Sequence, residues 1–391
     1  MLATTRHHRK QNQQTTMNDL FDNEISAFPT TYEDILYRMK QVQPIKYGKT
    51  RNFLNGAVTY LSPYISRGVI STKQVFDFVR EETPYSLSSM EKFIQELAWR
   101  DYWQQVQKAK GEAINQDLKN IQEPIAHTAM PISVGQAKTG IEAIDRGIEN
   151  LHKTGYMHNH LRMYTASICC NMGQSHWKTP AKWMYYHLLD GDWASNALSW
   201  QWVAGANSNK KYYANQENIN KYCFTKQRGS FLDVSYQDFP EMPVPEVLKE
   251  AAMPELKTPL PESDTLEIHQ EVPTYVYNFY NLDPRWDQEE DANRVLLLEP
   301  EHFEAYPISQ NSVDFMLGLG KNIKGLQVFV GSFSQLQQHC GASEIHFKEH
   351  PFNEHYRGIE HERDWMFNVE GYYRSFFAFW KKCQKELKSA F

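Results

Sequence analysis

The sequence predicts a mainly α-helical domain followed by a small α/β domain with a short parallel sheet. Three observations support this fold class: apolar residues recur at helical spacing as far as about residue 238, seven prolines then crowd into residues 240–273, and short apolar runs follow. The chain of 391 residues is long enough for two domains of ordinary size. We expect a disordered N-terminus at 1–18, a helical domain at 19–239, a proline-rich linker at 240–273, and an α/β domain with a C-terminal helix at 274–391.

The helical prediction rests on six segments in which apolar residues repeat every three or four positions, as they do on one face of a helix. These segments are 32–42, 72–80, 88–109, 140–151, 155–172 and 180–189. No segment before the prolines alternates convincingly as a strand does.

Beyond the prolines the pattern changes to short buried strands rich in β-branched and aromatic residues. The predicted strands are 274–280, 294–300, 326–332 and 344–350. Helical patterns at 312–322 and 334–339 separate the last three strands. Alternation of strand and helix is typical of a parallel sheet.

Composition excludes several classes of protein. Net charge is −6, so any contact with nucleic acid needs a local basic patch rather than attraction to the whole molecule. The five cysteines contain no C-x-x-C pair and suit a reducing compartment. No apolar run is long enough to span a membrane. His158 and His160 lie two positions apart and point in different directions on a helix, which argues against a metal site. We therefore expect a cytoplasmic protein without a metal or a membrane contact.

Polar residues of unusual type concentrate between residues 154 and 213. On a helix, Asn159, Arg162 and Met163 fall within about one turn of each other and share a face. That arrangement places a cation beside an apolar thioether.

A second group lies in a glycine-containing turn that opens a new helix. Asp190, Asp192 and Asn196 can accept from a ring N–H and donate to a ring nitrogen, which suits a planar heterocycle. The alternative is a capping cluster in which Asp192 or Ser195 caps the helix, the commonest use of such residues. The residues alone leave both interpretations open.

Four motifs resemble those of the photolyase and cryptochrome family. TGYMHNHLRM (154–163) and LLDGDWASNALSWQWVAG (188–205) are similar to its flavin-binding signature, and TYLSPYISRGVIS (59–71) and ELAWRDYW (96–103) are similar to its two upstream motifs. They occur in the family's order across roughly residues 30–230. The resemblance implies a photolyase-like FAD-binding domain, with FAD as cofactor.

The resemblance also assigns residues to the cofactor. Matches to the residues that hold the FAD phosphates are Tyr47, Thr59, Leu61 and Ser62. Arg100 and Arg162 match arginines near the cofactor, and Arg162 is expected to pair with Asp190. Asp190 and Asp192 match ring-contacting acids, and Asn196 matches the residue that faces flavin N5.

The family's pocket for a flipped-out cyclobutane pyrimidine dimer has counterparts in Glu96, Trp99, Asn159, Met163 and Trp202. Stacking by the two tryptophans, a hydrogen bond from Glu96 and an apolar wall from Met163 suit that substrate. Core packing is the alternative role for either tryptophan.

Other matches concern electron supply and DNA. Trp200 and Trp177 match the proximal and middle members of the family's tryptophan chain, whereas the distal position is Val134. His160 replaces an arginine that grips DNA phosphate, which we expect to weaken DNA binding or to make it depend on pH. Lys210 and Lys211 begin a basic cluster that offers a compensating surface.

The architecture departs from the family, because no antenna-binding α/β domain precedes the flavin domain in this sequence. We hypothesise that the C-terminal strands are a shortened version of that domain at the other end of the chain, and we do not expect an antenna chromophore. Two functions follow. The first is a blue-light-driven DNA repair lyase that splits cyclobutane pyrimidine dimers in damaged DNA. The second is a cryptochrome-like photoreceptor or redox sensor without repair activity, which signals through a protein partner of the C-terminal domain. The match of the dimer pocket favours repair.

Overall fold

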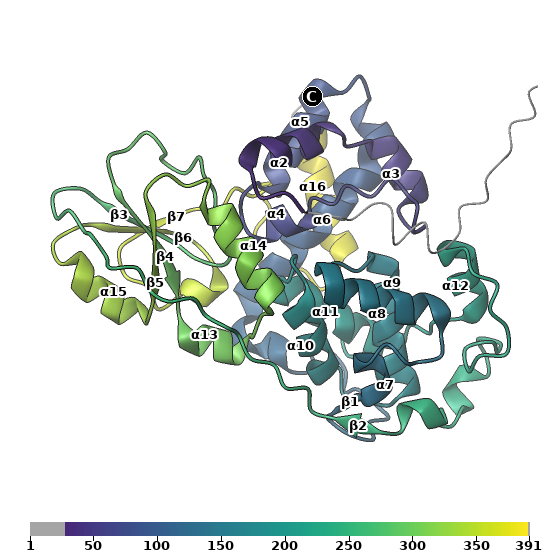
Figure 1. Ribbon diagram of the computed structural model, residues 1–391. Coiled ribbons are helices and arrows are strands. Elements are labelled where there is room, and N and C mark those ends of the chain that lie inside the picture. Colours follow the sequence, from purple (N-terminus) through teal and green to yellow (C-terminus); the bar gives the residue numbers. More distant parts are fainter. Residues whose placement is uncertain (1–27, 390–391) are drawn as a thin grey trace, which may run out of the picture.

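The computed structural model describes residues 28–389, so the segment expected to be disordered, 1–18, lies outside the described residues. A helical part and a parallel sheet with its own helices stand beside each other (Figure 1). The helical part contains α2 (Tyr32–Lys40), α3 (Pro44–Thr50), α4 (Ser62–Ser66), α5 (Thr72–Glu82), α6 (Leu87–Lys110), α7 (Ile132–Gly135), α8 (Glu142–Thr154), α9 (Asn159–Ser167), α10 (Lys178–His187), α11 (Trp193–Ala204) and α12 (Gln216–Cys223).

All six predicted helices are present, and the largest boundary difference has a local cause. The sequence predicts one helix from residue 155 to residue 172, but α9 begins at Asn159. Gly155 adopts a positive φ of 71° and ends α8, and His158 then caps α9 by accepting from the backbone N–H of His160 at 3.2 Å. A π-helical turn, Ile168–Met172, continues α9 to the predicted end.

Helix α6 lies at the centre of the helical part. Its first half buries Met90, Phe93, Ile94 and Ala98 on one face, whereas every residue from 101 to 107 is buried. A helix buried on all sides must be surrounded by other elements. Helices α3, α5, α11 and the C-terminal helix all pack against α6.

The sheet is parallel throughout, as the alternation of strands and helices predicts. Its strands are β3 (Thr274–Tyr277), β4 (Asn293–Leu298), β5 (Leu326–Val330), β6 (Ile345–Lys348) and β7 (Ile359–His361), in the order β5-β4-β3-β6-β7. The connecting helices are α13 (Pro300–Ala305), α14 (Gln310–Gly320) and α15 (Phe333–Cys340). The chain adds β4 and β5 on one side of β3 and then β6 and β7 on the other, which makes the carboxyl ends of β3 and β6 a topological switch point.

Two findings differ from the sequence prediction. Strand β7 was not predicted, because Ile359, Glu360 and His361 carry no apolar pattern and form a short, largely exposed edge. Two-residue strands β1 (Met130–Pro131) and β2 (Ala251–Ala252) also pair antiparallel, which places a strand in the helical part. Residues 253–269, within the proline-rich segment, form no helix or strand.

The helical part and the sheet share one hydrophobic core. One face of the sheet, with Tyr277, Leu296 and Leu298, joins the core of the helical part through α13 and α14, whereas the other face packs on α15 in a smaller cluster. Asn322, just after α14, accepts from the backbone N–H of Tyr32 at 2.8 Å and so ties α14 to the start of α2. The two parts are thus joined by buried contacts as well as by residues 240–273.

The C-terminal helix α16 (Phe376–Ser389) leaves the sheet and packs against α6 (Figure 1). Composition predicts it as part of the α/β domain, but its apolar residues Phe376, Phe379 and Trp380 are buried against the helical part. No helix within residues 28–389 is long and apolar enough to cross a membrane.

Candidate functional site

The predicted acidic turn, Asp190-Gly191-Asp192, joins α10 to α11. Asp190 pairs with Arg162 of α9 as predicted, with 3.0 Å between Arg162 Nη2 and Asp190 Oδ2. Burial by itself would raise the pKa of Asp190, but the Arg162 guanidinium outweighs it and holds that pKa below its usual range. The carboxylate is therefore charged at neutral pH although its side chain is 4% exposed.

Asp192 caps α11, so the capping alternative is correct for this residue. Its Oδ2 accepts from the backbone N–H of Ser195 at 3.0 Å, and its Oδ1 accepts from the Gln104 side chain. The Ser195 hydroxyl is not the cap and has no hydrogen-bond partner. Both Asp192 oxygens are therefore already engaged inside the protein, and a ring contact has to use their remaining lone pairs.

The buried side chain of Arg67 binds the backbone of the acidic turn. Its Nη2 donates to the carbonyl of Gly191, and the neighbouring Ser66 hydroxyl donates to the carbonyl of Asp190 at 2.9 Å. The guanidinium lies 3.4 Å from the centre of the Phe279 ring, which follows β3 in the α/β part. Burial lowers the pKa of Arg67 to about 10. Sequence reasoning missed this residue, because an arginine between Ser66 and Gly68 gives no sign that it is buried.

Two acceptor atoms around this turn fit the predicted cofactor. Asp190 Oδ1 is buried and has no partner with full hydrogen-bond geometry among the described residues, although the Ser62 hydroxyl is near enough to help lower the pKa of Asp190. Such an oxygen is costly to bury unless a ligand donates to it. Asn196 uses its Nδ2 to donate to the carbonyl of Ala181 at 2.8 Å, and its Oδ1 forms no hydrogen bond to any described residue. Two fixed acceptors beside a charged arginine suit the N–H groups of a flavin ring.

The residues expected to hold the FAD phosphates lie on α3 and at the start of α4. Tyr47 packs edge-on against Phe93 of α6 at 5.2 Å, and burial raises its pKa. Thr59 Oγ1 accepts from the backbone N–H of Leu61 at 3.4 Å. Ser62 is the first residue of α4, the helix whose Ser66 touches the acidic turn. Helix α4 thus contacts the acidic turn through Ser66, and the role of Tyr47, Thr59, Leu61 and Ser62 in holding phosphates stays a prediction.

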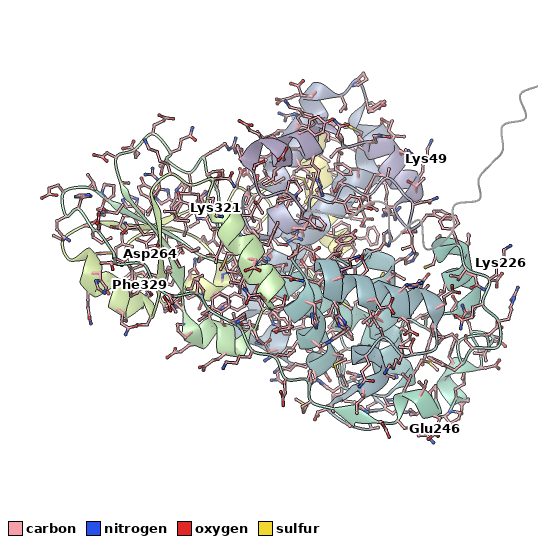
Figure 2. The ribbon with its side chains drawn as sticks, in the orientation of Figure 1. Lys49, Lys226, Glu246, Asp264, Lys321 and Phe329 are labelled. Atoms are coloured by element: carbon pink, nitrogen blue, oxygen red, sulfur yellow. The ribbon has the colours of Figure 1, made fainter. Side chains whose placement is uncertain are left out.

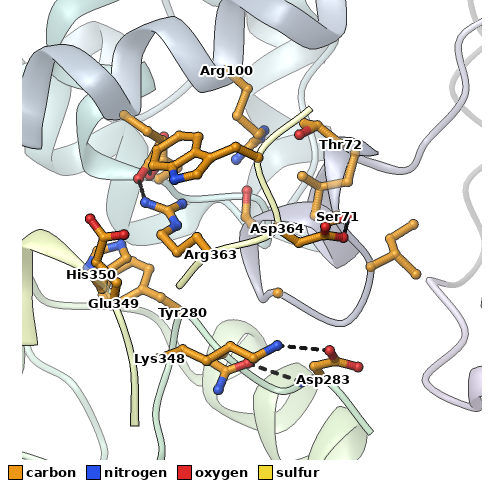
Figure 3. A pocket seen from close by; sticks show the side chains of 18 of the residues that line it. Ser71, Thr72, Arg100, Tyr280, Asp283, Lys348, Glu349, His350, Arg363 and Asp364 are labelled. Atoms are coloured by element: carbon orange, nitrogen blue, oxygen red, sulfur yellow. Dashed lines mark hydrogen bonds and ion pairs between the residues drawn. The ribbon is translucent and has the colours of Figure 1, made fainter. Parts of the chain in front are cut away.

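Arg100 points from α6 into a cavity of about 100 Å³ between the helical part and the sheet (Figure 3). Its guanidinium forms no hydrogen bond or ion pair with the residues that the structure describes. The cavity also touches Asp192 and Gln104 of the helical part, and Asn278, Tyr280, Lys348 and His350 at the carboxyl ends of β3 and β6. Ligands of open α/β sheets bind outside such a switch point. Lys348 is already paired with Asp283 at 2.9 Å, which leaves Arg100 as a cation of this cavity without a direct partner in the described chain.

The predicted dimer pocket is divided among three helices that pack together. Glu96 and Trp99 lie on α6, Asn159 and Met163 on α9, and Trp202 on α11, which contacts both other helices. Glu96 Oε1 accepts from Arg51 Nε at 3.1 Å and from Lys92 Nζ at 3.0 Å, so two cations flank its charge. Asn159 and Trp202 are exposed, and Glu96, Trp99 and Met163 are partly exposed.

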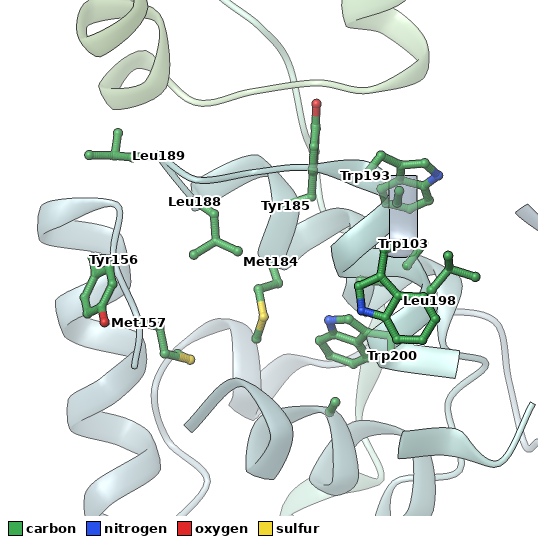
Figure 4. Close-up of a cluster of buried hydrophobic side chains, with 14 of the residues drawn as sticks. Trp103, Tyr156, Met157, Met184, Tyr185, Leu188, Leu189, Trp193, Leu198 and Trp200 are labelled. Carbon is green, nitrogen blue, oxygen red and sulfur yellow. The ribbon is translucent and has the colours of Figure 1, made fainter. Parts of the chain in front are cut away.

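Both members of the predicted tryptophan chain, Trp177 and Trp200, are buried. Trp177 is fully buried and donates its Nε1–H to Asp117 at 2.7 Å. Its ring neighbour is Trp193, 6.5 Å away, and among the described residues Trp200 makes no ring contact with Trp177. Trp193 and Trp200 both extend from α11 (Figure 4). Val134 is fully buried, and its aliphatic side chain supplies no aromatic ring at the distal position.

The predicted DNA contacts are of two kinds. His160 Nδ1 donates to the carbonyl of Asn52 at 2.8 Å, the ring stacks on Tyr164, and burial lowers the pKa of His160 below 6.5. Lys210 is exposed and Lys211 partly exposed, and burial lowers the pKa of Lys211. Lys226 lies at the outer edge of the molecule near α12 (Figure 2). Lys210 lies near Trp202, because the Ser208 hydroxyl bonds the carbonyls of both residues, whereas burial favours the neutral form of His160.

Metal ligation has no support in the described part of the chain, where no group of three or more His, Cys, Asp or Glu side chains could hold an ion. All five cysteines are buried as free thiols. Burial raises the pKa of Cys169, Cys170 and Cys223, so these thiols are not activated nucleophiles.

The fold and this site define a helical flavin-binding domain. Residues 93–235 match the family profile described as the FAD binding domain of DNA photolyase. A deoxyribodipyrimidine photo-lyase of Buchnera aphidicola subsp. Baizongia pistaciae is 29% identical over 262 residues, which are 64% of this chain and 53% of that protein. Cryptochrome-1 of Arabidopsis thaliana is 26% identical over 179 residues, which are 41% of this chain and 25% of that protein.

A solved structure, the cryptochrome of Synechocystis sp. PCC6803, matches with a TM-score of 0.47 and 26% identity, over 50% of this chain and 44% of that chain. The chain thus spans about half the length, or less, of the relatives that it matches. Residues 93–235 of the helical part thus match the FAD-binding domain of the photolyase/cryptochrome family, whose cofactor is FAD.

Proposed function

We propose that the protein uses bound FAD and blue light to split cyclobutane pyrimidine dimers in damaged DNA. The observation that carries the proposal is the exposure of Trp202. This residue leaves 38% of its surface accessible, whereas the other nine tryptophans are buried or partly buried. An exposed indole beside exposed lysines is typical of a surface that stacks against nucleic-acid bases.

Each pocket residue has a role in this proposal. Trp99 and Trp202 stack against the two pyrimidine rings, Met163 supplies an apolar wall, and the Asn159 amide hydrogen-bonds a base edge. Arg51 and Lys92 both bind Glu96 Oε1, which leaves the other carboxylate oxygen to accept a hydrogen bond from a base N–H.

The cofactor residues complete the arrangement. When bound, FAD supplies the electron that opens the dimer in light and takes it back afterwards. Asp190 and Asn196 present fixed acceptors to the ring, Arg162 holds Asp190 in place, and the Tyr47, Thr59, Leu61 and Ser62 segment holds the phosphates. Trp200 and Trp177 are the proposed route by which electrons reach the cofactor.

The test starts from protein purified in the dark, with its FAD measured by absorbance and reduced chemically. Irradiated oligothymidine is added, and the loss of dimers is followed under blue light and in the dark. Chemical reduction bypasses the tryptophan route and so removes Val134 from the question. Light-dependent loss of dimers, reduced strongly in Trp202→Ala, supports the proposal. Bound FAD without repair of either single- or double-stranded DNA refutes it.

A second candidate is a flavin photoreceptor without repair activity. It is favoured by the neutral His160, which lacks the charge for a DNA phosphate, and by the buried Val134. In that case light is expected to change the binding of a protein partner to the sheet and its helices. A light-dependent partner together with absent repair would establish this second function.

A further inference from the structure

Trp99 is the end member of a stack of three nearly parallel aromatic rings. The ring of Phe376 lies 3.9 Å from that of Trp99, with 10° between their planes. On α16, the ring of Trp380 lies 6.2 Å from that of Phe376, with 12° between planes. The C-terminal helix thus lays two aromatic rings behind a residue of the predicted dimer pocket.

The chain that carries Phe376 is fixed to α6 along its length. The backbone N–H of Met366 donates to Asp101 at 3.0 Å, and Tyr102 donates to the carbonyl of Tyr373 at 3.1 Å. Farther along, Gln384 donates to Glu91 at 2.6 Å. Helix α6 also carries Glu96 and Arg100, so one helix links the C-terminal segment to both the predicted substrate pocket and the cofactor site.

Burial shows on which side of Trp99 the C-terminal helix lies. Phe376 is 3% exposed and Trp380 is 2% exposed, whereas Trp99 is partly exposed. A ring that plugged the mouth of the pocket would itself face solvent. Trp99 remains partly exposed, so Phe376 covers one face of the indole without burying the whole ring.

We propose that Phe376 is a positioning residue, which fixes the plane of Trp99 so that its outer face can stack against a pyrimidine of the substrate. The inference rests on the proposed function and extends the site to the C-terminal helix. Trp99 also contacts Tyr102 edge-on at 5.7 Å and Trp103 at 5.1 Å, but Phe376 is the ring that lies nearly parallel to its plane. A leucine at position 376 would keep an apolar contact with Trp99 but would remove the parallel aromatic ring and its stacking energy.

The test compares Phe376→Leu with Phe376→Tyr and with the neighbouring control Phe377→Leu, since Phe377 is 62% exposed. All variants retain FAD, which is checked by absorbance. Affinity for an oligonucleotide with one dimer is measured in the dark against the undamaged oligonucleotide. Phe376→Leu is expected to weaken dimer binding by about two- to tenfold, the value of one aromatic pair, without changing binding of undamaged DNA. Phe376→Tyr and Phe377→Leu are expected to bind as the unchanged protein does.

A second measurement does not depend on DNA. Tryptophan is replaced by 5-fluorotryptophan, and the ¹⁹F resonance of Trp99 is assigned by its loss in Trp99→Phe. Phe376→Leu is expected to shift and change the width of this resonance, and Phe376→Tyr to restore it. An unchanged resonance in Phe376→Leu overturns the positioning role, as does tighter dimer binding, which would mean that α16 competes with the substrate. If the unchanged protein binds no dimer, the proposed function fails, and the ¹⁹F spectrum alone then decides whether Phe376 fixes Trp99.

Discussion

Removal of either partner of the Arg162–Asp190 pair is expected to destabilise the protein by unequal amounts. The Asp190 side chain is 4% exposed, and its Oδ1 already lacks a partner, so Arg162→Met leaves a buried carboxylate without a cation. We expect this change to cost about 3–5 kcal/mol of unfolding free energy. Arg162 is 20% exposed, and its Nε still donates to the carbonyl of Met157 at 2.7 Å after Asp190→Asn. That change is expected to cost about 1–3 kcal/mol.

Urea denaturation of FAD-free protein at pH 7, followed by circular dichroism, measures both values without the added stability from bound FAD. Asp77→Asn is the control, because Asp77 forms a surface pair with Lys73 and Arg80 and its loss is expected to cost less than about 1 kcal/mol. The pKa of Asp190 is lowered by folding, so its contribution is present above its ordinary pKa and is lost as the pH falls through the folded value. An Asp190→Asn cost larger than that of Arg162→Met, or equal to that of Asp77→Asn, would refute the reasoning.

Three further predictions follow from burial and charge. Burial raises the pKa of Asp101 to about 6, so the stability that depends on its protonated form is present below about pH 4 and is lost as the pH rises through 6. Melting temperatures measured at pH 4.5, 6 and 8 should show this fall. The Asp101→Asn variant should not show it. Trp202→Ala should weaken binding of dimer-containing DNA by roughly 1–3 kcal/mol in a titration while leaving the melting temperature nearly unchanged, and an unchanged affinity would return Trp202 to a role outside the pocket. Because burial lowers the pKa of His160, DNA affinity should not change with pH between 7 and 8. His160→Arg should strengthen binding and make the slope of log affinity against log salt concentration steeper by roughly one unit. No change in that slope would place residue 160 away from the DNA phosphates.

Local sequence pattern was enough to predict the helices with regular apolar spacing and the strands that are buried throughout. Helices α5 and α6 follow their apolar spacing, and strands β3 and β4 are buried at every position, which gives a continuous apolar run. Strand β7 could not be found in the same way, because an exposed edge strand needs no apolar residues. Its pairing with β6 depends on backbone hydrogen bonds, which leave no mark in the side-chain sequence.

The site was predictable where a residue type has few uses. The pairing of Arg162 with Asp190 follows from the resemblance, and a single buried carboxylate needs such a partner. Residues whose importance comes from their position alone were missed. Gln104 bridges Asp192 and Arg363, and nothing in its sequence surroundings separates it from the next two polar residues of α6. Long-range contacts of this kind arise only when α6, the acidic turn and the C-terminal segment are brought together.

Composition places a domain boundary at residue 273, but the contacts around the site do not end there. Arg67 is a fully buried cation whose Nε and Nη1 have no hydrogen-bond partner, and its guanidinium rests on Phe279. Loss of residues 274–389 would remove that aromatic surface and the Phe376 ring behind Trp99, and would expose the shared core to water. The acidic turn depends on Arg67, and Arg67 depends on Phe279. The sheet and C-terminal helix therefore belong to the scaffold of the flavin site, whatever else they bind.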